Sequence, residues 1–541
     1  MKDSFRQRMA WLHTWCGLAC GWLLCAIFLT GTLSVFREPI TRWMQAQPAL
    51  PASPEAIVLT QAEVLQRAAR YLAATAPDAS LWGMDMPRHE GDAIHLWQAG
   101  SRSPAIRQAA MDPRTGTLLP APWGRQTEGG RHFMAFHYSL EAGLAGFWVV
   151  GAMAMGMLVA LVSGVVVHKR IFQDFFTFRP GKGQRSWLDA HNATAVLALP
   201  FLFMIVYTGL AIFYTSYVPL PLHAVFGSDD NAFSRFQGEL SPETPLLRPR
   251  TGKAAAMHDL APLLRQARAL TGSPASRLMV ERPADTSMVI KILGRTPDTG
   301  TSRRILNEAS SVTFDGVTGA VLDVKRPDPA DAHSAKDIHR VMEQLHLVGF
   351  GGWTMKWLYF FSGLSGTAMM ATGTLLFTVK RRKKSEHEFG AFTARVYCGI
   401  ETLNVAAMAG LCIACIAYLY GNRLIPADLP DRAAWEIRIF FYAWLATLLH
   451  AMVQPPVRAW LTQLSAGALL CLGLPLLNAL STAQQAWTYV SREDWERAGV
   501  ELTVIGFGLV LAFAAWQVRR GWSGRATPAK ATPASSRPVK T

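Results

Sequence analysis

Eight long apolar runs dominate the sequence. They lie near residues 15–36, 144–167, 193–215, 353–379, 397–419, 436–453, 459–481 and 500–518. A helix of ~20 apolar residues crosses the ~30 Å hydrocarbon core of a bilayer, because each residue adds ~1.5 Å. The pattern therefore predicts a protein with eight transmembrane helices. The first run has no Ala-x-Ala cleavage site before Pro39, so we interpret it as a retained helix and not as a secretory signal.

Two long segments of mixed polarity, 38–140 and 216–350, separate the first four runs. Each opens with an amphipathic helical pattern, contains strand-like runs such as 288–293, and carries an Asp-x-x-Thr-Gly turn in which glycine suits a positive φ. The helical patterns cover 60–72 and 257–270, and the turns cover 112–116 and 315–319. Each segment therefore predicts a small α+β domain outside the membrane.

An internal duplication relates these two units. His13 precedes the pair Thr30-Gly31 by 17 residues, and His191 precedes Thr208-Gly209 by 17 residues. The second spans also align without a gap, pairing Arg131, His137, Gly143, Trp148, Ser163 and Gly164 with Arg340, His346, Gly352, Trp357, Thr372 and Gly373. Spans one to four are therefore predicted to form a parallel duplication about a two-fold axis along the membrane normal. The last four spans carry no copy of this pattern.

The net charge of +15 is concentrated in the segments between spans. Lysine and arginine cluster in the amino-terminal tail, in 169–185, in 380–395 and after Val518. If the spans alternate, all four clusters lie on one side, which the positive-inside rule identifies as the cytoplasm. This placement argues against nucleic-acid binding and puts both termini in the cytoplasm.

These patterns divide the chain into eight parts. They are the cytoplasmic tail and first span (1–37), the first external domain (38–140), spans two and three with their loop (141–215), the second external domain (216–350), the fourth span (351–380), a basic cytoplasmic linker (381–395), a four-span extension (396–519) and a disordered cytoplasmic tail (520–541).

Five histidines mark the ends of spans in the duplicated unit. His137 and His346 lie at the outer ends, and His13, His168 and His191 lie at the inner ends. If 131–170 is one helix, the 31-residue separation puts His137 and His168 roughly 46 Å apart, so they cannot share a metal centre. Imidazole is a common axial ligand of haem iron. The two-fold relation predicts that His137 and His346 face each other across one haem, and that His13 and His191 do so at the inner face.

Several alternatives stay open at this point. His168 has no repeat counterpart, since Phe377 occupies that place, and it is a rival inner ligand with His191 or His13. A lone histidine at a membrane boundary is commonly an interfacial polar residue. The small residues that follow each histidine either leave room for a porphyrin edge or let helices pack closely. His132, His333 and His339 touch a substrate or are solvated loop residues.

The remaining chemistry of the sequence is sparse. None of the seven cysteines lies in the external domains, so no disulfide framework is indicated, and Cys412 and Cys415 are better explained by helix packing than by a redox pair. The chain has no GxGxxG motif after a strand and no Walker A loop. Electrons would therefore come from a separate cytoplasmic reductase or from membrane quinol.

The sequence resembles the PepSY-associated transmembrane helix family of iron-regulated bacterial inner-membrane proteins. The resemblance covers about residues 5 to 385. It is carried by Trp11-Leu-His13, Thr30-Gly31, Val167-His168-Lys-Arg170, Phe175-Phe-Thr-Phe-Arg-Pro180, Trp187-Leu-Asp-Ala-His191-Asn192 and the two Asp-x-x-Thr-Gly turns. It implies PepSY-like periplasmic domains, two b-type haems near opposite membrane faces, and reduction of ferric siderophores in the periplasm. The four-span extension departs from the basic form.

The sequence thus predicts a mainly α-helical membrane protein that acts as a dihaem ferrisiderophore reductase of the bacterial inner membrane. Electrons enter at the inner haem and reduce Fe(III) outside, where iron is released because siderophore oxygens hold Fe(II) weakly. The expected partners are a ferric siderophore, an electron donor and membrane lipid. No catalytic residue beyond the haem ligands is needed. The alternatives are a transporter of siderophore or metal, and a non-catalytic regulator that binds a periplasmic partner.

Overall fold

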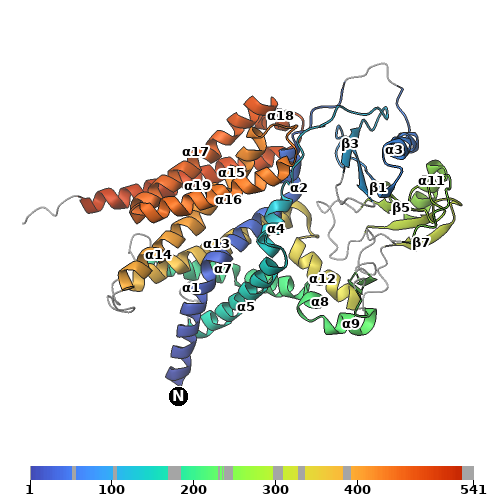
Figure 1. The fold of residues 1–541 in the computed structure, drawn as a ribbon. Coiled ribbons are helices and arrows are strands. Elements are labelled where there is room, and N and C mark those ends of the chain that lie inside the picture. The colour runs from blue at the N-terminus through green and yellow to red at the C-terminus, as the bar shows by residue number, and fades with distance from the viewer. Residues whose placement is uncertain are drawn as a thin grey trace, which may run out of the picture.

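Eight helices in the computed structural model are long and apolar enough to cross a membrane, which confirms a multi-pass membrane protein (Figure 1). The described residues are 2–51, 57–100, 107–168, 184–229, 232–233, 235–236, 248–295, 309–326, 335–381 and 392–526. The spans belong to α1 (Lys2–Ser34), α5 (Gly143–Val167), α7 (Gln184–Ala211), α13 (Gly352–Arg381), α14 and α15 (Thr393–Val405 and Leu411–Leu424, joined by the π-helical turn Ala406–Gly410), α16 (Arg432–Val453), α17 (Pro456–Thr482) and α19 (Trp495–Ala526).

The helix bundle carries a β-sheet at one end, which we call the sheet side (Figure 1). The start of α1 and the end of α19 lie at the other end, the terminal side. The basic segments 169–183 and 382–391, which the sequence analysis places in the cytoplasm, lie outside the described residues, as does the tail after residue 526.

The first four spans pack as two related pairs. α1 packs against α5, α7 packs against α13, and α1 also packs against α13. A short helix precedes the second span of each pair, α4 (Arg131–Ser139) before α5 and α12 (Ala335–Leu347) before α13. Residues with positive φ separate the helices, namely Leu140, Glu141 and Gly143 in one pair and Val348, Gly351 and Gly352 in the other. The segment 131–170 is therefore not one helix, because the chain turns sharply after α4.

The two external segments join in one seven-stranded antiparallel sheet of order β3-β2-β1-β4-β5-β6-β7. The first segment contributes β1 (Ala79–Asp85), β2 (Ile94–Gly100) and β3 (Arg107–Met111), and the second contributes β4 (Ala275–Glu281), β5 (Val289–Gly294), β6 (Ser311–Asp315) and β7 (Val321–Lys325). β1 and β4 pair at the junction, with Trp82 opposite Val280. The α+β character is confirmed, and the two predicted units share one sheet.

The sheet and two helices enclose a single apolar core. α3 (Gln61–Thr75) and α11 (Leu260–Thr271) bury one face each against the strands, as Leu65 and Leu263 show. Thr60 and Glu63 cap the start of α3 with reciprocal hydrogen bonds. The Asp315–Gly319 turn joins β6 to β7, and Gly319 takes a φ of +74° as predicted.

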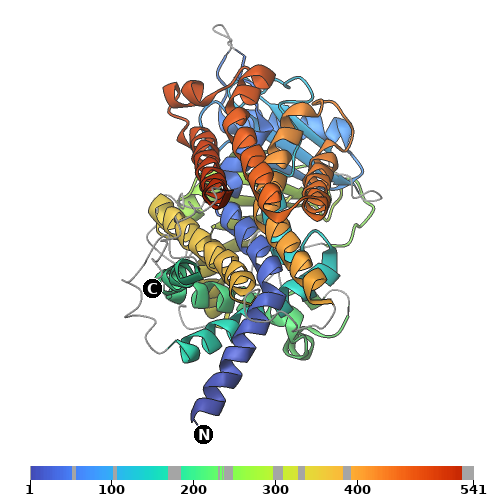
Figure 2. The same cartoon turned by 90° about the vertical axis from the view of Figure 1, so that its left-hand side faces the viewer.

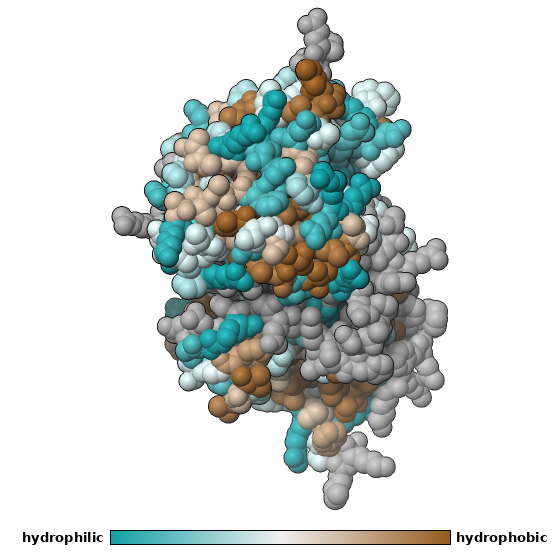
Figure 3. Space-filling view, turned by 90° about the vertical axis from the view of Figure 1, so that its right-hand side faces the viewer, coloured by the Kyte–Doolittle hydropathy of each residue, from teal (hydrophilic) through white to brown (hydrophobic). Residues whose placement is uncertain are grey.

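Helices α14 to α19, which we call the extension, pack beside the duplicated core. Figure 2 shows them in orange and red against α1 in blue and α13 in yellow. α15 and α19 contact α2 (Arg37–Gln45) of the core, and the short helix α18 (Ala486–Ser491) packs on α19 within the extension. Two further short helices, α8 (Tyr214–Tyr217) and α9 (Leu220–Phe226), follow α7. The spans expose many large apolar side chains, whereas hydrophilic residues cover much of the sheet-side domain (Figure 3).

Candidate functional site

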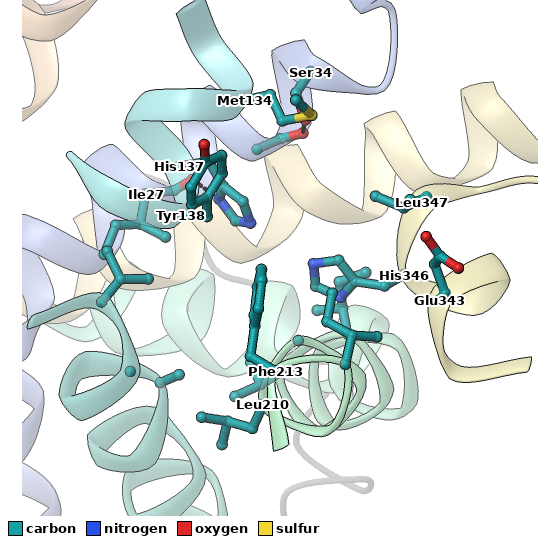
Figure 4. Close-up of a pocket in the computed structure, with 18 of the residues that line it drawn as sticks. Ile27, Ser34, Met134, His137, Tyr138, Leu210, Phe213, Glu343, His346 and Leu347 are labelled. Atoms are coloured by element: carbon teal, nitrogen blue, oxygen red, sulfur yellow. Dashed lines mark hydrogen bonds between the residues drawn. The ribbon is translucent and has the colours of Figure 1, made fainter. Parts of the chain in front are cut away.

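The sheet-side pair consists of His137 and His346, at the ends of α4 and α12. Their ring centroids lie 6.1 Å apart, with the ring planes at 30° to each other. Figure 4 shows both rings pointing into one cavity from opposite walls. The duplication therefore brings its two equivalent histidines together, as the repeat predicts.

The hydrogen bonds of the sheet-side pair fix the tautomer of each ring. His137 Nδ1 lies 2.8 Å from the Ile27 carbonyl oxygen, which can only accept, so Nδ1 carries the proton. His346 Nδ1 lies 3.1 Å from Thr208 Oγ1, whose own hydrogen is directed to the backbone carbonyls of Met204 and Ile205. In the neutral rings the lone pair is then on Nε2 in both residues. That nitrogen is available to a metal ion.

The terminal-side pair, His13 and His191, repeats this arrangement. The ring centroids lie 6.3 Å apart, with an interplanar angle of 62°. His13 Nδ1 donates to the Ala160 carbonyl oxygen and His191 Nδ1 donates to the Met369 carbonyl oxygen, each at 2.8 Å. In both neutral rings the lone pair is therefore on Nε2.

Each of the four imidazole rings packs against a glycine of a neighbouring helix, which we call its seating glycine. A Cβ atom built on Gly31 would lie 2.5 Å from His137 Nδ1, and one on Gly209 would lie 2.8 Å from His346 Cε1. The corresponding distances are 3.0 Å for Gly164 with His13 and 3.1 Å for Gly373 with His191. Each of the four rings is hydrogen-bonded to the backbone carbonyl of the residue four before its glycine, namely Ile27, Ile205, Ala160 and Met369. Absence of the side chain lets the imidazole approach the helix closely enough to reach that carbonyl.

His168 joins the terminal-side pair as a third imidazole. Its ring centroid lies 6.5 Å from that of His13, at an interplanar angle of 78°. The structure therefore keeps all three predicted inner histidines together. His13 and His191 are the two that share the repeat-equivalent seating on carbonyl and glycine, which favours them over His168 as the pair.

The centroid separations of both pairs, 6.1 and 6.3 Å, would allow each pair to hold one metal ion between its two imidazoles. With metal–nitrogen distances of about 2.0 Å, two imidazoles that share one ion have centroids about 6 Å apart. Within the described residues, no group of three or more His, Cys, Asp or Glu side chains forms a site for a bare ion. Two imidazoles suffice for haem, whose porphyrin supplies the other four ligands.

The two sites are separated along the helices. His13 and the His137-bound carbonyl of Ile27 both belong to α1, 14 residues apart, which corresponds to roughly 21 Å of helix rise. On α7, His191 and Ile205 are also 14 residues apart, and the Ile205 carbonyl is hydrogen-bonded to His346. The pairs therefore lie at different depths in the membrane.

A cavity of about 1070 Å³ surrounds the sheet-side pair. This volume lies at the upper end of the ~300–1,000 Å³ typical of small-molecule sites. Aromatic side chains such as Phe28, Phe147 and Trp148 line it, and glycines leave space in its walls. Polar residues gather where it approaches the sheet side, namely Arg37, His339, Arg340 and Glu343. The site therefore combines an apolar interior with a charged mouth.

Burial keeps the sheet-side pair neutral. Desolvation lowers the pKa of His137, although its bond to the Ile27 carbonyl opposes this. Desolvation, with a contribution from the neighbouring His137, lowers the pKa of His346 to about 3. Neutral imidazole is the form that binds a metal.

The other histidines singled out in the sequence do not all lie at the sheet-side cavity. His339 lines the cavity, and its Nδ1 is buried without a hydrogen-bond partner among the described residues. His132 is buried on the far side of α4, between Tyr418 and Phe440, with Nδ1 2.9 Å from Glu141. His333 lies outside the described residues. The seven cysteines, all among the described residues, form no disulfide in the structure.

The sequence leaves two roles open for the small residues that follow each histidine, space for a porphyrin edge or close helix packing, and Gly21, Gly143 and Gly146 are examples of them. Gly21 packs against Thr374, and Gly146 packs against the Ser139 carbonyl. Gly143 does line the cavity. The sequence reading missed the four seating glycines, although the Thr-Gly and Ser-Gly pairs that signal them were part of the repeat match.

Comparison with known proteins identifies the duplicated part of the chain. Residues 10–380 match the family described as the PepSY-associated TM region. An uncharacterized protein of Pseudomonas aeruginosa is 26% identical over 404 residues, which cover 72% of this chain and 95% of that protein. The family match ends at the close of α13, so the extension lies beyond it.

Proposed function

Because the chain belongs to the PepSY-associated transmembrane family, we propose that it is a dihaem b oxidoreductase of the bacterial inner membrane. In this proposal it carries electrons across the membrane and reduces Fe(III) bound by a siderophore on the sheet side, which is the periplasm. The terminal side is then the cytoplasm, in keeping with the basic segments at 169–185 and 380–395.

One observation carries the proposal. Two imidazole pairs, equivalent by repeat, have centroid separations of 6.1 and 6.3 Å, and the Nδ1 atoms of all four rings are engaged in hydrogen bonds. Nothing in helix packing alone calls for four such rings with Nε2 directed away from the bonded helix. Haem, when bound, supplies a one-electron Fe(III)/Fe(II) couple.

The protein's own residues fix how such a couple is held. His137 and His346 would hold the sheet-side haem, and His13 and His191 the terminal-side haem, with His168 as the alternative. The carbonyl bonds orient the four rings and raise their basicity as ligands. The apolar cavity walls exclude water, which tunes the potential of a bound metal.

The mouth of the cavity suits the reducible substrate. Arg37 and Arg340 outnumber the single carboxylate of Glu343 among the described residues there, which favours an anionic chelate. His339 offers an imidazole whose Nδ1 has no partner within the described part of the chain. His339 precedes His346 by two helical turns on α12, so the two side chains share one face about 10 Å apart. Substrate bound there would lie within a short distance of the sheet-side pair.

Optical spectra of the purified protein test the proposal. We expect a low-spin b-type spectrum at about two haems per chain, falling toward one haem in His346→Ala and in His13→Ala. His223→Ala, an exposed histidine on α9, is the matched control and should keep both haems. Dithionite-reduced protein should then reduce a ferric hydroxamate.

A folded protein without Soret absorbance would refute the dihaem proposal. Siderophore transport through the cavity, or partner binding by the sheet, would then be the functions to test. Retention of both haems in His346→Ala would instead show that the sheet-side pair is assigned wrongly.

A further inference from the structure

A second cavity lies where the extension meets the duplicated core. We call this space, of about 440 Å³, the seam cavity. One wall comes from α1, α2, α4 and α13, and the other comes from α15, α17 and α19. Helix α2 of the first group packs against α15 and α19 of the second. Half of the seam cavity is therefore built by helices beyond the family match.

Aromatic rings form one wall of the seam cavity. The Phe36 ring stacks on Trp353 at a centroid distance of 6.1 Å and lies 4.8 Å from Trp357 and 5.4 Å from Phe360. Phe507 of the extension faces Phe360 at 6.2 Å. A wall of aromatic side chains suits a planar ring, which can stack on one ring and pack edge to face with another.

One end of the seam cavity is polar and reaches solvent. Glu496 lines it and lies 3.2 Å from His89 Nε2, with the two side chains 23% and 38% exposed. Arg42, 3.7 Å from Glu496, is already paired with Asp92 and Asp494. The carboxylate therefore connects the cavity to solvent on the sheet side through an imidazole.

The lining of the seam cavity follows α19. Its lining on α19 extends from Glu496 to Leu511, about 22 Å along the helix, toward the middle of the membrane. A ligand with a polar ring at one end and an apolar tail matches this distribution. A phospholipid head group matches it poorly, because its phosphate would meet the Glu496 carboxylate.

The seam cavity shares a wall with the cavity of the sheet-side pair. On α1, Leu33 faces the seam cavity and Ser34 faces the other; on α13, Phe360 and Tyr359 divide in the same way. One layer of helix, about 10 Å thick, therefore separates the two cavities.

We propose that the seam cavity binds an isoprenoid quinol of the membrane and that this quinol donates electrons to the sheet-side pair. Its ring lies among the aromatic side chains near Glu496, and its tail follows α19. This inference rests on the proposed function, for which it names an electron donor. Electrons that cross the membrane would still pass by way of the terminal-side pair, and the quinol is a second source that enters at the sheet side.

The reaction balances without another reactant. Oxidation of one quinol to quinone breaks two O–H bonds and releases two protons and two electrons. The Glu496 carboxylate accepts each proton in turn and passes it through His89 to solvent. Two ferric chelates accept the two electrons, one each, and become ferrous. Haem held by His137 and His346 would supply the one-electron couple between the quinol and the chelates.

Photolabelling tests binding without relying on haem. A short-chain azidobenzoquinone, applied to the full-length protein in detergent, should label peptides from both walls, around residues 33–40, 353–360 and 495–507. Gly499 lines the cavity and has open space at its Cβ position, so Gly499→Leu should fill the cavity and reduce labelling roughly tenfold or more. Gly506→Leu, on the same helix with open space but outside the lining, should label as the wild type does.

Rapid mixing with decylubiquinol tests electron donation. Haem in the wild type should become reduced, whereas Glu496→Gln should bind the photolabel normally and react roughly a hundredfold more slowly, as loss of a proton acceptor predicts. Labelling that is scattered, or unchanged in Gly499→Leu, would overturn the quinol site. Normal labelling with no haem reduction would overturn the donor role. Absence of haem would refute the proposed function, while the labelling would still decide the site.

Discussion

Each candidate haem ligand depends on one glycine in a neighbouring helix. Gly31→Ala would place a Cβ 2.5 Å from His137 Nδ1, so the ring must leave the Ile27 carbonyl. Overpacking of this kind costs about 1–3 kcal/mol. We expect Gly31→Ala to lose sheet-side haem in a pyridine haemochrome assay. Gly373→Ala, where the contact is 3.1 Å, should have a milder effect on the terminal-side haem.

Gly17→Ala is the control for this prediction. It lies on α1 with open space around the Cβ position, and replacing a helical glycine by alanine favours the helix by up to about 1 kcal/mol. The variant should keep both haems. Equal haem loss in Gly17→Ala and Gly31→Ala would contradict the seating role.

The identity of the candidate ligands could be predicted from the sequence, because the duplication selects His13, His137, His191 and His346 by spacing alone. The glycine that packs against each imidazole could not be predicted from the sequence. Which helix faces each ring depends on tertiary packing, so Gly31 and Gly209 had no distinguishing feature beyond their place after threonine. The same limit applies to His168, whose closeness to His13 follows from how α5 packs on α1.

Asp285 makes the sheet domain sensitive to acid. Its carboxylate accepts hydrogen bonds from Thr251, Gly252 and Ser287, and these bonds hold its pKa well below the ordinary value. A lowered folded-state pKa contributes stability above the unfolded pKa near 3.9, and this stability is lost as the pH falls below it. Asp285→Asn should therefore unfold at lower temperature at pH 7 and lose less stability than the wild type between about pH 5 and pH 3. Identical pH profiles, measured by hydrogen exchange over 248–295, would contradict this role.

At the scale of elements, α4 links the sheet-side pair to the extension. One face carries His137 toward the cavity, while Phe133 and Phe136 are buried against the extension, where Phe136 lies 5.5 Å from Phe440 and 5.8 Å from Trp444. The extension therefore determines the position of one ligand. The apolar run predicted the span, but hydropathy does not report the positive φ of Leu140 and Glu141 that separates α4 from α5.

Phe136→Ala should loosen α4 from the extension. Removing a buried phenylalanine costs about 3–5 kcal/mol, and the change should appear in the low-spin EPR signal of the sheet-side haem, with the terminal-side signal unchanged. Phe513→Ala, a lipid-exposed site on α19, is the control and should alter neither signal. Equal shifts in both haem signals would argue against a specific link through α4.

At the scale of the molecule, the two repeat units contact each other both in the external sheet and in the membrane. β1 and β4 join the sheet across the two units, and α1 and α13 pack together in the membrane. The repeat predicted two external units and their fold, but strand pairing between units depends on edges that periodicity does not specify. The extension breaks the two-fold relation, because among the described residues it packs on α2 and α4 of the first unit but on α13 alone of the second.

Arg423 links the extension to the core. Its replacement should lower the free energy of unfolding of the protein much more than replacement of an exposed arginine does. The guanidinium donates to the Trp43 and Met44 carbonyls of α2 and to Asn478 of α17, and it lies 3.7 Å over the Trp43 ring while only 3% exposed. Arg423→Met should destabilise the protein by roughly 2–5 kcal/mol, since each buried polar group left unpaired costs about 1–3 kcal/mol. Arg438→Met removes a similar contact, 4.6 Å over Trp435, at an exposed position worth only about 0.5–1 kcal/mol. Thermal unfolding of both variants in detergent measures the difference. Equal stability of the two would show that the extension is held by its apolar contacts alone, and the seam cavity would then survive without Arg423.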